Sequence, residues 1–272
     1  MRCAITGSTG YVGSAIARHF EAQGWEVLHL NRRAGWDLNA DPEKIAWGNV
    51  DALVHCAYDF RSAGWEEMRR VNVDGSVRLL KTARRHGVSR AVFISSVSAF
   101  AGCRSLYGKA KTLTENAALQ MGCAAVRPGL VYGAKPGGMM AALERAAGAG
   151  KLLPMIGDGS YPQYLVHDED LARFVFLLCQ RETPVPAFPV TAAYPEKVPL
   201  RDIIRRIAAR KEREVRFIPI PWRLIYLGLK TLEALRLPAP FRSDSLIGMV
   251  YQNAAPDFAL PPGVNASFRR FE

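Results

Sequence analysis

The sequence predicts an α/β fold in which a doubly wound parallel sheet is covered by helices on both faces. Two observations support this prediction. Short apolar runs alternate with longer segments of helical periodicity through the first half of the chain, and a glycine-rich turn joins the first apolar run to the first helix. Strands that alternate with helices are joined by right-handed crossovers, so the sheet is expected to be parallel and buried on both faces.

The expected elements follow in order along the chain. Strands are predicted at residues 3–6, 26–30, 52–56, 91–95, 124–127 and 188–191. Helices are predicted at residues 12–23, 65–85, 107–121 and 168–181, and Gly24 and Gly87 end the first two. A further helix after Pro199, an apolar run at 215–220 and a helix at about 222–237 complete the chain.

Two units are expected from this pattern. After Gly129 the alternation loosens, and glycine and proline cluster at residues 133–138 and 157–162, which is typical of loops beside a ligand cleft. We therefore predict a larger domain at residues 1–132, to which residues 161–192 return. Residues 133–160 and 193–272 are predicted to form a small interleaved lobe.

Composition excludes several classes of protein. Of 272 residues, 49% are hydrophobic and 22% charged, which indicates a globular rather than a disordered chain. No run of 18 uncharged apolar residues is present, so no transmembrane segment is expected. The net charge of +11 comes mainly from amphipathic stretches such as residues 78–85, which are typical of solvated helix faces. Without a zinc-finger spacing or an aromatic RNA-binding signature, nucleic acid is not an expected partner.

The cysteines and histidines favour a reduced protein without a metal site. The five cysteines have no paired spacing, and the five histidines are scattered. Because Met1 leads directly into a strand, we expect no leader peptide and a cytoplasmic location. His167 precedes the acidic run at residues 168–170, and we expect it to orient the start of a helix whose first turn favours acids.

The glycine-rich turn predicts a dinucleotide site. Residues 7–13 read GSTGYVG between a buried strand and a helix. Glycines at such a turn allow the backbone to approach a pyrophosphate, which then lies at the helix N-terminus. The predicted contacts are Gly7, Thr9, Gly10, Tyr11, Val12 and Gly13.

The end of the second strand favours NADP, with NAD as the alternative. An NAD site usually carries an acid there for the ribose hydroxyls, whereas Arg32 and Arg33 suit a 2′-phosphate. Asp37 and Leu38 lie where a carboxylate and an apolar contact would flank the adenine.

A serine-rich strand end and a Tyr-x-x-x-Lys segment supply candidate acid–base chemistry. The strand at 91–95 runs into serines, and Tyr107 and Lys111 follow at a spacing that shares a helix face. A nearby ammonium lowers a tyrosine pKa, so Lys111 is expected to make Tyr107 a usable base. Ser96 would steady the substrate oxygen, with Ser95 and Ser98 as the rival serines.

These motifs resemble the extended short-chain dehydrogenase/reductase family, which includes NAD(P)-dependent sugar epimerases and dehydratases and has the Rossmann fold. Residues 6–13 resemble its TGxxGxxG, residues 55–58 its HxAA segment, and residues 72–76 its NVxGT segment. Residues 127–133 resemble its RPxxVYG, and residues 164–172 its xxVHVxDxA. Tyr58 and Ser76 depart from the pattern.

The resemblance implies roles for individual residues. Ser96, Tyr107 and Lys111 would be the catalytic set, and Lys111 would also hold the cofactor ribose. Only eleven residues separate Ser96 from Tyr107, so a substrate-contacting loop is shortened. The larger domain would bind NAD(P) and the lobe the substrate, a nucleotide-activated sugar. Cofactor contacts are implied for Cys56, Ala57, Ser95, Tyr107, Lys111 and Pro128.

Several alternatives stay open at the level of sequence. The motifs favour an epimerase, whereas Arg32 and Arg33 favour a reductase with exchangeable NADPH. A dehydratase is disfavoured because Val97 and Ser98 stand where an acid pair is expected. A catalytically inactive cofactor-binding protein is the alternative from another class. The segment at 222–237 predicts a helix that packs on the lobe or on a partner in a homodimer, with attachment to a membrane surface as the other interpretation.

Overall fold

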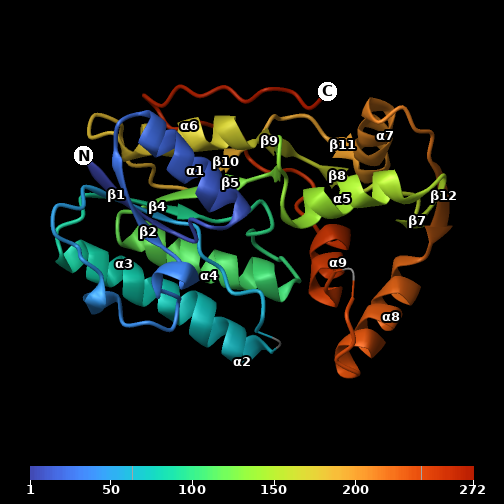
Figure 1. The fold of residues 1–272 in the computed structure, drawn as a ribbon, viewed down its shortest axis with the longest axis horizontal. Helices are drawn as coiled ribbons and strands as arrows, with labels where there is room; N and C mark the ends of the chain where they lie inside the picture. The colour runs from blue at the N-terminus through green and yellow to red at the C-terminus, as the bar shows by residue number, and fades with distance from the viewer. Residues whose placement is uncertain (63, 240) are drawn as a thin grey trace.

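A six-stranded parallel sheet forms the centre of the computed structural model, which describes residues 1–62, 64–239 and 241–272 (Figure 1). The strands lie in the order β10-β5-β4-β3-β1-β2, and every pairing between them is parallel. The predicted doubly wound α/β fold is therefore confirmed. The strands are β1 (Arg2–Thr6), β2 (Glu26–Leu30), β3 (Ala52–His55), β4 (Arg90–Ile94), β5 (Ala124–Pro128) and β10 (Val190–Ala192).

Helices cover both faces of the sheet (Figure 1). On one face α1 (Tyr11–Ala22) packs beside α6 (Asp168–Cys179), and on the other α3 (Gly75–Arg85) packs beside α4 (Leu106–Gln120). Successive strand residues serve opposite faces: Cys3 and Ile5 join the core under α1, whereas Ala4 joins the core under α3. The apolar runs in the sequence form these strands, whose side chains are buried on both faces of the sheet.

The helix expected over residues 65–85 is interrupted. It consists of α2 (Trp65–Met68), a π-helical turn (Arg69–Asp74) and α3. Within the turn, the Asn72 side chain accepts a hydrogen bond from the Asp59 backbone N–H at 2.6 Å and donates one to the Asp59 carbonyl at 3.0 Å. The segment that resembles NVxGT thus ties the loop after β3 to the helix layer. Short 3₁₀ turns at Arg32–Ala34 and Pro42–Lys44 follow β2.

The remaining elements build a lobe with its own core around Met140, Met155, Ile203 and Ile207. Three small sheets pair β6 (Leu130–Tyr132) with β9 (Leu165–His167), β7 (Leu152–Ile156) with β12 (Arg216–Ile220), and β8 (Pro162–Gln163) with β11 (Val198–Pro199). The helices are α5 (Gly138–Ala149), α7 (Leu200–Arg210), α8 (Trp222–Ala234) and α9 (Ser243–Val250). Of these elements, only α7, β12 and α8 are anticipated by the sequence analysis.

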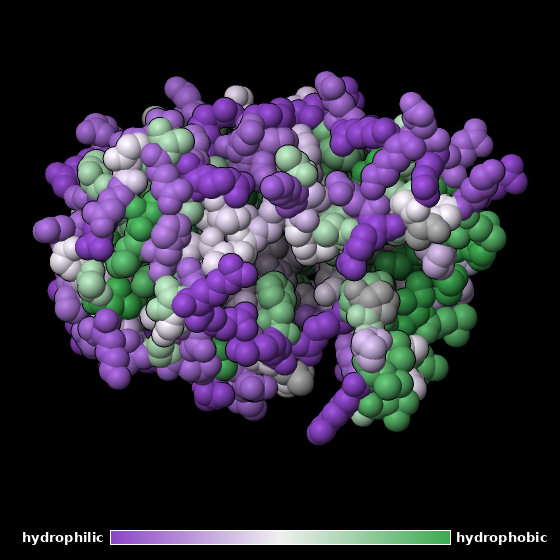
Figure 2. All heavy atoms as spheres, in the orientation of Figure 1, coloured by the Kyte–Doolittle hydropathy of each residue, from purple (hydrophilic) through white to green (hydrophobic). Residues whose placement is uncertain are grey.

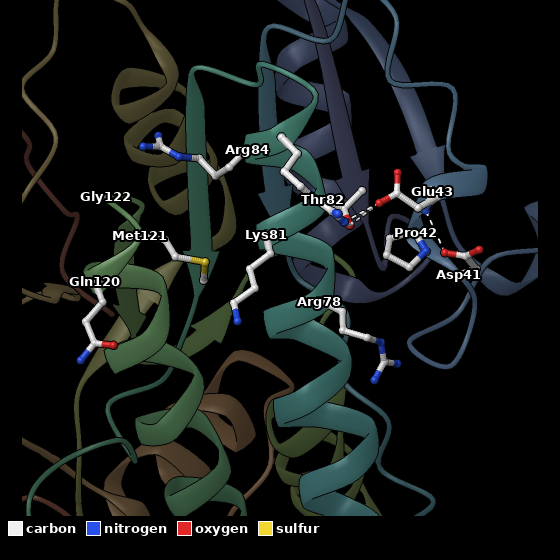
Figure 3. A pocket seen from close by; sticks show the side chains of 11 residues that line it. Asp41, Pro42, Glu43, Arg78, Lys81, Thr82, Arg84, Gln120, Met121 and Gly122 are labelled. Carbon is white, nitrogen blue, oxygen red and sulfur yellow. Dashed lines mark hydrogen bonds and ion pairs between the residues drawn. The ribbon is translucent and has the colours of Figure 1, made fainter.

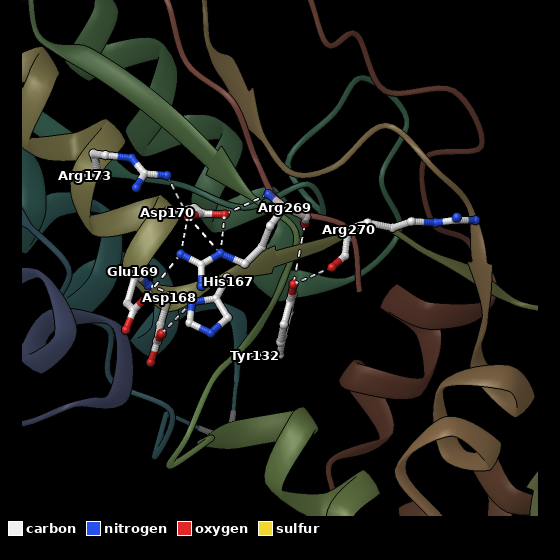
Figure 4. A network of polar contacts seen from close by, with 8 residues as sticks. All are labelled: Tyr132, His167, Asp168, Glu169, Asp170, Arg173, Arg269 and Arg270. Atoms are coloured by element: carbon white, nitrogen blue, oxygen red, sulfur yellow. Dashed lines mark hydrogen bonds and ion pairs between the residues drawn. The ribbon is translucent and has the colours of Figure 1, made fainter. Parts of the chain in front are cut away.

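The C-terminal tail returns across the first domain and passes over α6 (Figure 1). Figure 4 shows how it is fixed: the buried Asp170 carboxylate accepts hydrogen bonds from the backbone and the guanidinium of Arg269. Phe268 packs edge-on against Phe174 of α6, with ring centroids 5.6 Å apart. The end of the chain, grouped with the lobe by the sequence division, therefore contributes to the core of the first domain.

Candidate active site

A cleft of about 610 Å³ opens at the carboxyl ends of β1, β3, β4 and β5. It lies where the strand order reverses between β1 and β3, the usual ligand position in doubly wound sheets. Its size falls within the range of small-molecule and cofactor sites. Apart from Arg33, every residue predicted from the sequence to bind cofactor or to act in catalysis lines this cleft: Gly7, Thr9, Gly10, Tyr11, Val12, Gly13, Arg32, Asp37, Leu38, Cys56, Ala57, Ser95, Ser96, Tyr107, Lys111 and Pro128.

The glycine turn is packed so closely that side chains are excluded. Gly7 has a φ of +65°, and a Cβ on Gly13 would lie 2.3 Å from the Gly7 carbonyl oxygen. Helix α1 begins after Gly10, which provides no side-chain cap, so the first N–H groups of α1 are available at the cleft. This arrangement fits a pyrophosphate.

Thr6 joins the ends of the two strands that flank the cleft. Its hydroxyl oxygen accepts hydrogen bonds from the backbone N–H groups of Cys56 at 3.0 Å and Ala57 at 3.1 Å. The same hydroxyl lies 2.7 Å from Nδ1 of the buried His55, whose Nε2 is 2.7 Å from the Ser76 hydroxyl. Burial lowers the pKa of His55 to about 3, so the ring is neutral and its role is structural.

Four polar side chains around the cleft have a buried polar atom without a hydrogen-bond partner among the described residues. They are the hydroxyls of Tyr11, Tyr58 and Ser95 and the indole N–H of Trp36. An orphaned hydroxyl costs free energy unless a ligand or water meets it. Together with the glycine turn, these hydroxyls fit the polar outline of a dinucleotide.

The two arginines predicted to select the cofactor are separated. Arg32 lines the cleft, whereas Arg33 does not. Asn31 occupies the end of β2 and donates a hydrogen bond of 2.9 Å to the Ser8 hydroxyl, so a neutral amide stands where NAD sites usually carry an acid. Asp37 and Leu38 also line the cleft.

Ser96, Tyr107 and Lys111 line the same cleft. The Lys111 ammonium donates a hydrogen bond of 2.7 Å to the Ile94 carbonyl at the end of β4. The Ser96 hydroxyl accepts one of 3.1 Å from the Ser98 backbone N–H. The side chain of Ser96 also lowers the Tyr107 pKa, an effect that favours Ser96 over its rivals.

The expected effect of Lys111 on Tyr107 is wrong for this geometry. Burial raises the pKa of Tyr107 to about 12, and Ser96 offsets the rise only in part. The Lys111 ammonium lies 5.9 Å from the Tyr107 ring centroid and is directed to the Ile94 carbonyl. Burial also lowers the pKa of Lys111 to about 8, so part of its charge is lost near neutral pH. Tyr107 is consequently a protonated phenol.

The sequence profile of the NAD dependent epimerase/dehydratase family matches residues 3–188. The chain belongs to this family. The resemblance inferred from the motifs is thereby confirmed, and the matched region includes the glycine turn, the serines after β4 and the Tyr-x-x-x-Lys segment.

Individual relatives of this family are more distant. The chain is 24% identical to 2-alkyl-3-oxoalkanoate reductase of Stenotrophomonas maltophilia over 77% of its length and 75% of the relative's. It is 26% identical to dTDP-4-dehydro-6-deoxy-D-allose reductase of Streptomyces bikiniensis over 88% and 92%. A solved structure of MoeE5 in complex with UDP-glucose and NAD has the same fold, with a TM-score of 0.68, 19% identity and coverage of 92% and 97%.

Two aromatic residues of the site are missed by sequence reasoning. Tyr58 lies edge-on to Tyr107 with ring centroids 4.9 Å apart, and Phe60 stacks near the same ring at 6.0 Å. Both line the cleft, and Phe60 is largely exposed. The departure of Tyr58 from the family's HxAA segment is the signal that could have found them.

His167 has the structural role that the sequence predicts. Its Nδ1 accepts a hydrogen bond of 3.3 Å from the Glu169 backbone N–H at the start of α6 (Figure 4). The neighbouring Asp168 packs against Gly133, where a Cβ would lie 2.4 Å from the carboxylate. The motif that resembles RPxxVYG therefore ends in glycine because α6 begins against it.

A second hollow, of about 720 Å³, lies at the opposite edge of the sheet (Figure 3). It is lined by Arg78, Lys81 and Arg84 of α3 and by the end of α4. Both helices present their C-terminal ends there, where the helix dipole disfavours an anion. Ser96, Tyr107 and Lys111 line the first cleft and not this hollow.

Proposed function

We propose that the protein is an NADPH-dependent reductase that converts a ketone of a nucleotide-activated sugar into an alcohol. The proposal rests on the partly buried Tyr107, whose raised pKa of about 12 keeps the phenol protonated, and on its place with Ser96 in a cleft that also holds the glycine turn. A protonated phenol is suited to donate a proton to a carbonyl oxygen as that oxygen becomes an alkoxide. An epimerase would first need Tyr107 to remove a proton from a substrate hydroxyl.

Different residues of the cleft would bind the cofactor and act on the substrate. Gly7, Gly10 and the start of α1 would hold the pyrophosphate, and Lys111 would hold the ribose. The bound nicotinamide supplies the hydride. Ser96 would donate a hydrogen bond to the carbonyl oxygen, and Tyr107 would transfer its proton to that oxygen.

Arg32 supports NADPH as the reductant. Arg32 lines the cleft directly after β2, where the adenosine end is expected, and the neighbouring Asn31 carries no charge to repel a 2′-phosphate. A guanidinium pairs with phosphate through charge-assisted hydrogen bonds, each worth about 1.5–3 kcal/mol net. Such a pair is enough for a preference of tenfold or more over NADH.

The sugar-nucleotide substrate is supported by the allose reductase relative, which the chain matches over most of both lengths. A second candidate is a ketone on an alkyl chain. It is favoured by the apolar wall that Tyr58, Phe60 and Met139 add to the cleft, and by the 2-alkyl-3-oxoalkanoate reductase relative. Both candidates share the same proton donor.

Steady oxidation of NADPH with a keto-sugar nucleotide tests the proposal, with 3-oxoalkanoates as the parallel substrate. Tyr107→Phe should retain NADPH binding and lose about 10²–10⁴ in turnover. Turnover only with 3-oxoalkanoates would select the second candidate. Interconversion of two sugar epimers by cofactor already bound, with no net change in NADPH absorbance, would overturn the reductase. Tight cofactor binding without turnover of any of these compounds would favour an inactive binding protein.

A further inference from the structure

Helix α8 presents leucines to the outside of the lobe instead of burying them. Leu224, Leu227 and Leu235 are 61%, 65% and 63% exposed. At 100° per residue these positions share one helix face with Thr231. Figure 2 shows the resulting hydrophobic surface at the outer end of the lobe, where Figure 1 places α8.

The opposite face of α8 anchors the helix to the lobe. Leu229 is buried, and Trp222 packs edge-on against Tyr251 with ring centroids 5.8 Å apart. Glu233, the one carboxylate in the helix sequence, accepts hydrogen bonds from the backbone and the hydroxyl of Ser243. The leucine face therefore cannot rotate inward without breaking these contacts, and it carries no acidic residue.

Cations border the leucine face. Arg223 and Lys230 lie beside it on the helix surface, and both are exposed. Lys230 lies 3.7 Å from Glu233 but keeps 54% of its side chain accessible. The adjoining β7 and β12 add Leu152, Ile218 and Arg216 to the exposed surface. An apolar stripe bordered by basic residues is the pattern of helices that lie in the interface of a membrane.

We propose that α8 docks on an anionic lipid bilayer, with Leu224 and Leu227 inserted among the acyl chains and with Arg223 and Lys230 against the lipid phosphates. In the described part of the chain no helix is long and apolar enough to cross a bilayer, so the contact is peripheral. The attachment is independent of the proposed function.

A second copy of the chain fits this face less well. A helix of 13 residues is about 20 Å long and ~10 Å wide, so its single exposed face is small against the ~800 Å² of accessible surface that each partner buries in a stable dimer. A second copy would bring the same cations to the interface and no acidic residue to pair with them on this face. A bilayer of anionic lipids supplies the opposite charge.

Co-sedimentation of the full chain with vesicles tests the proposal. Vesicles of phosphatidylcholine alone are compared with an equal mixture of phosphatidylcholine and phosphatidylglycerol. Wild-type protein should bind the anionic vesicles, and added salt should weaken binding. Leu224→Asp with Leu227→Asp should lower partitioning at least tenfold. The double variant Arg223→Gln, Lys230→Gln should partition roughly thirtyfold less onto the anionic vesicles. Its partitioning onto vesicles of phosphatidylcholine alone should equal that of the wild type.

The matched control is Leu113→Asp, which places the same charge on an exposed leucine of α4. It should partition like the wild type, and NADPH binding by each variant shows that the variant is folded. Failure of the wild type to bind anionic vesicles would overturn the proposal, as would equal binding by the Leu224→Asp, Leu227→Asp protein. The face would be assigned to a second copy if the wild type formed a dimer and did not bind vesicles, and if the Leu224→Asp, Leu227→Asp protein were a monomer.

Discussion

The carboxylate of Asp244 accepts a hydrogen bond of 3.0 Å from the backbone N–H of Tyr107, although 137 residues separate the two. The same carboxylate accepts one of 2.7 Å from the Leu106 N–H. Asp244 comes from α9 in the lobe, and it places a negative charge at the start of α4, where the helix dipole favours it. The lobe thus positions the helix that carries the proposed acid.

Replacing Asp244 with alanine should reduce catalysis without removing any group that touches the reactants. Loss of a helix N-terminal partner costs about 0.5–2 kcal/mol of stability, and a shift of the α4 start should lower kcat by about ten- to a hundredfold. The KM for NADPH should change little because the Asp244 carboxylate bonds to the start of α4 and not to the glycine turn that would hold the pyrophosphate. Steady-state kinetics and urea unfolding measure both effects. Asp244→Asn, which keeps one acceptor, should recover part of kcat; no recovery, or an equal loss of NADPH affinity, would contradict a positioning role.

The sequence predicts the structure well where contacts between residues close together in the chain determine it. The turn at residues 7–13 follows from steric limits within the turn itself, since a Cβ on Gly13 would collide with Gly7. The alternation of strands and helices likewise reflects burial on two faces of one sheet. The contact of Asp244 with α4 and the return of Arg269 to Asp170 join distant segments, and no periodicity encodes them. The pKa of Tyr107 cannot be predicted from the sequence for a related reason: the spacing to Lys111 is local, but burial and the Ile94 carbonyl come from tertiary packing.

The lowered pKa of Lys111 predicts a pH limit on the alkaline side. The ammonium is present below its pKa of about 8 and is lost as the pH rises through that value. Tyr107, with a pKa of about 12, stays protonated throughout this range and adds no further pH dependence to the rate. We therefore expect kcat/KM for NADPH-dependent reduction to fall as pH rises through about 8. The measurement is a profile between about pH 6 and pH 10.

Lys111→Arg tests whether Lys111 causes the fall of kcat/KM at alkaline pH. A guanidinium stays charged across the whole range, so a slower enzyme with a flat alkaline profile is expected. A wild-type profile without an alkaline fall would contradict the assignment, and so would an arginine variant that keeps the fall at the same pH.

Arg32 and its neighbour Arg33 offer a matched pair for cofactor selectivity. Only Arg32 lines the cleft, although both follow β2 and carry the same charge. Arg32→Ala should remove most of the preference for NADPH over NADH, a loss of tenfold or more, because the pairing with the 2′-phosphate disappears. Arg33→Ala should leave the preference within about twofold. Calorimetric titration of both cofactors checks this; tighter binding of NADH by the wild type, or equal effects of the two variants, would count against the role of Arg32.

Glu115 of α4 forms a largely buried ion pair with Arg127 of β5. Only 1% of the Glu115 side chain is exposed, and Arg127 donates to both carboxylate oxygens, at 2.9 Å and 2.5 Å. Removing one member of such a pair leaves a buried charge uncompensated, so Arg127→Met should cost about 3–5 kcal/mol in the free energy of unfolding. Adding Glu115→Leu to that variant should recover most of the loss, since two apolar side chains replace the pair.

The control for the stability loss in Arg127→Met is Arg181→Met, which removes the ion pair between Arg181 and Asp51. The Arg181 side chain is 67% exposed, and pairs at such positions contribute about 0–1 kcal/mol. Urea unfolding of the four proteins, with a common slope against denaturant, gives the differences. Equal losses for Arg127→Met and Arg181→Met would show that burial does not decide the strength of the Glu115 pair. A double variant less stable than Arg127→Met alone would show that Glu115 has other partners.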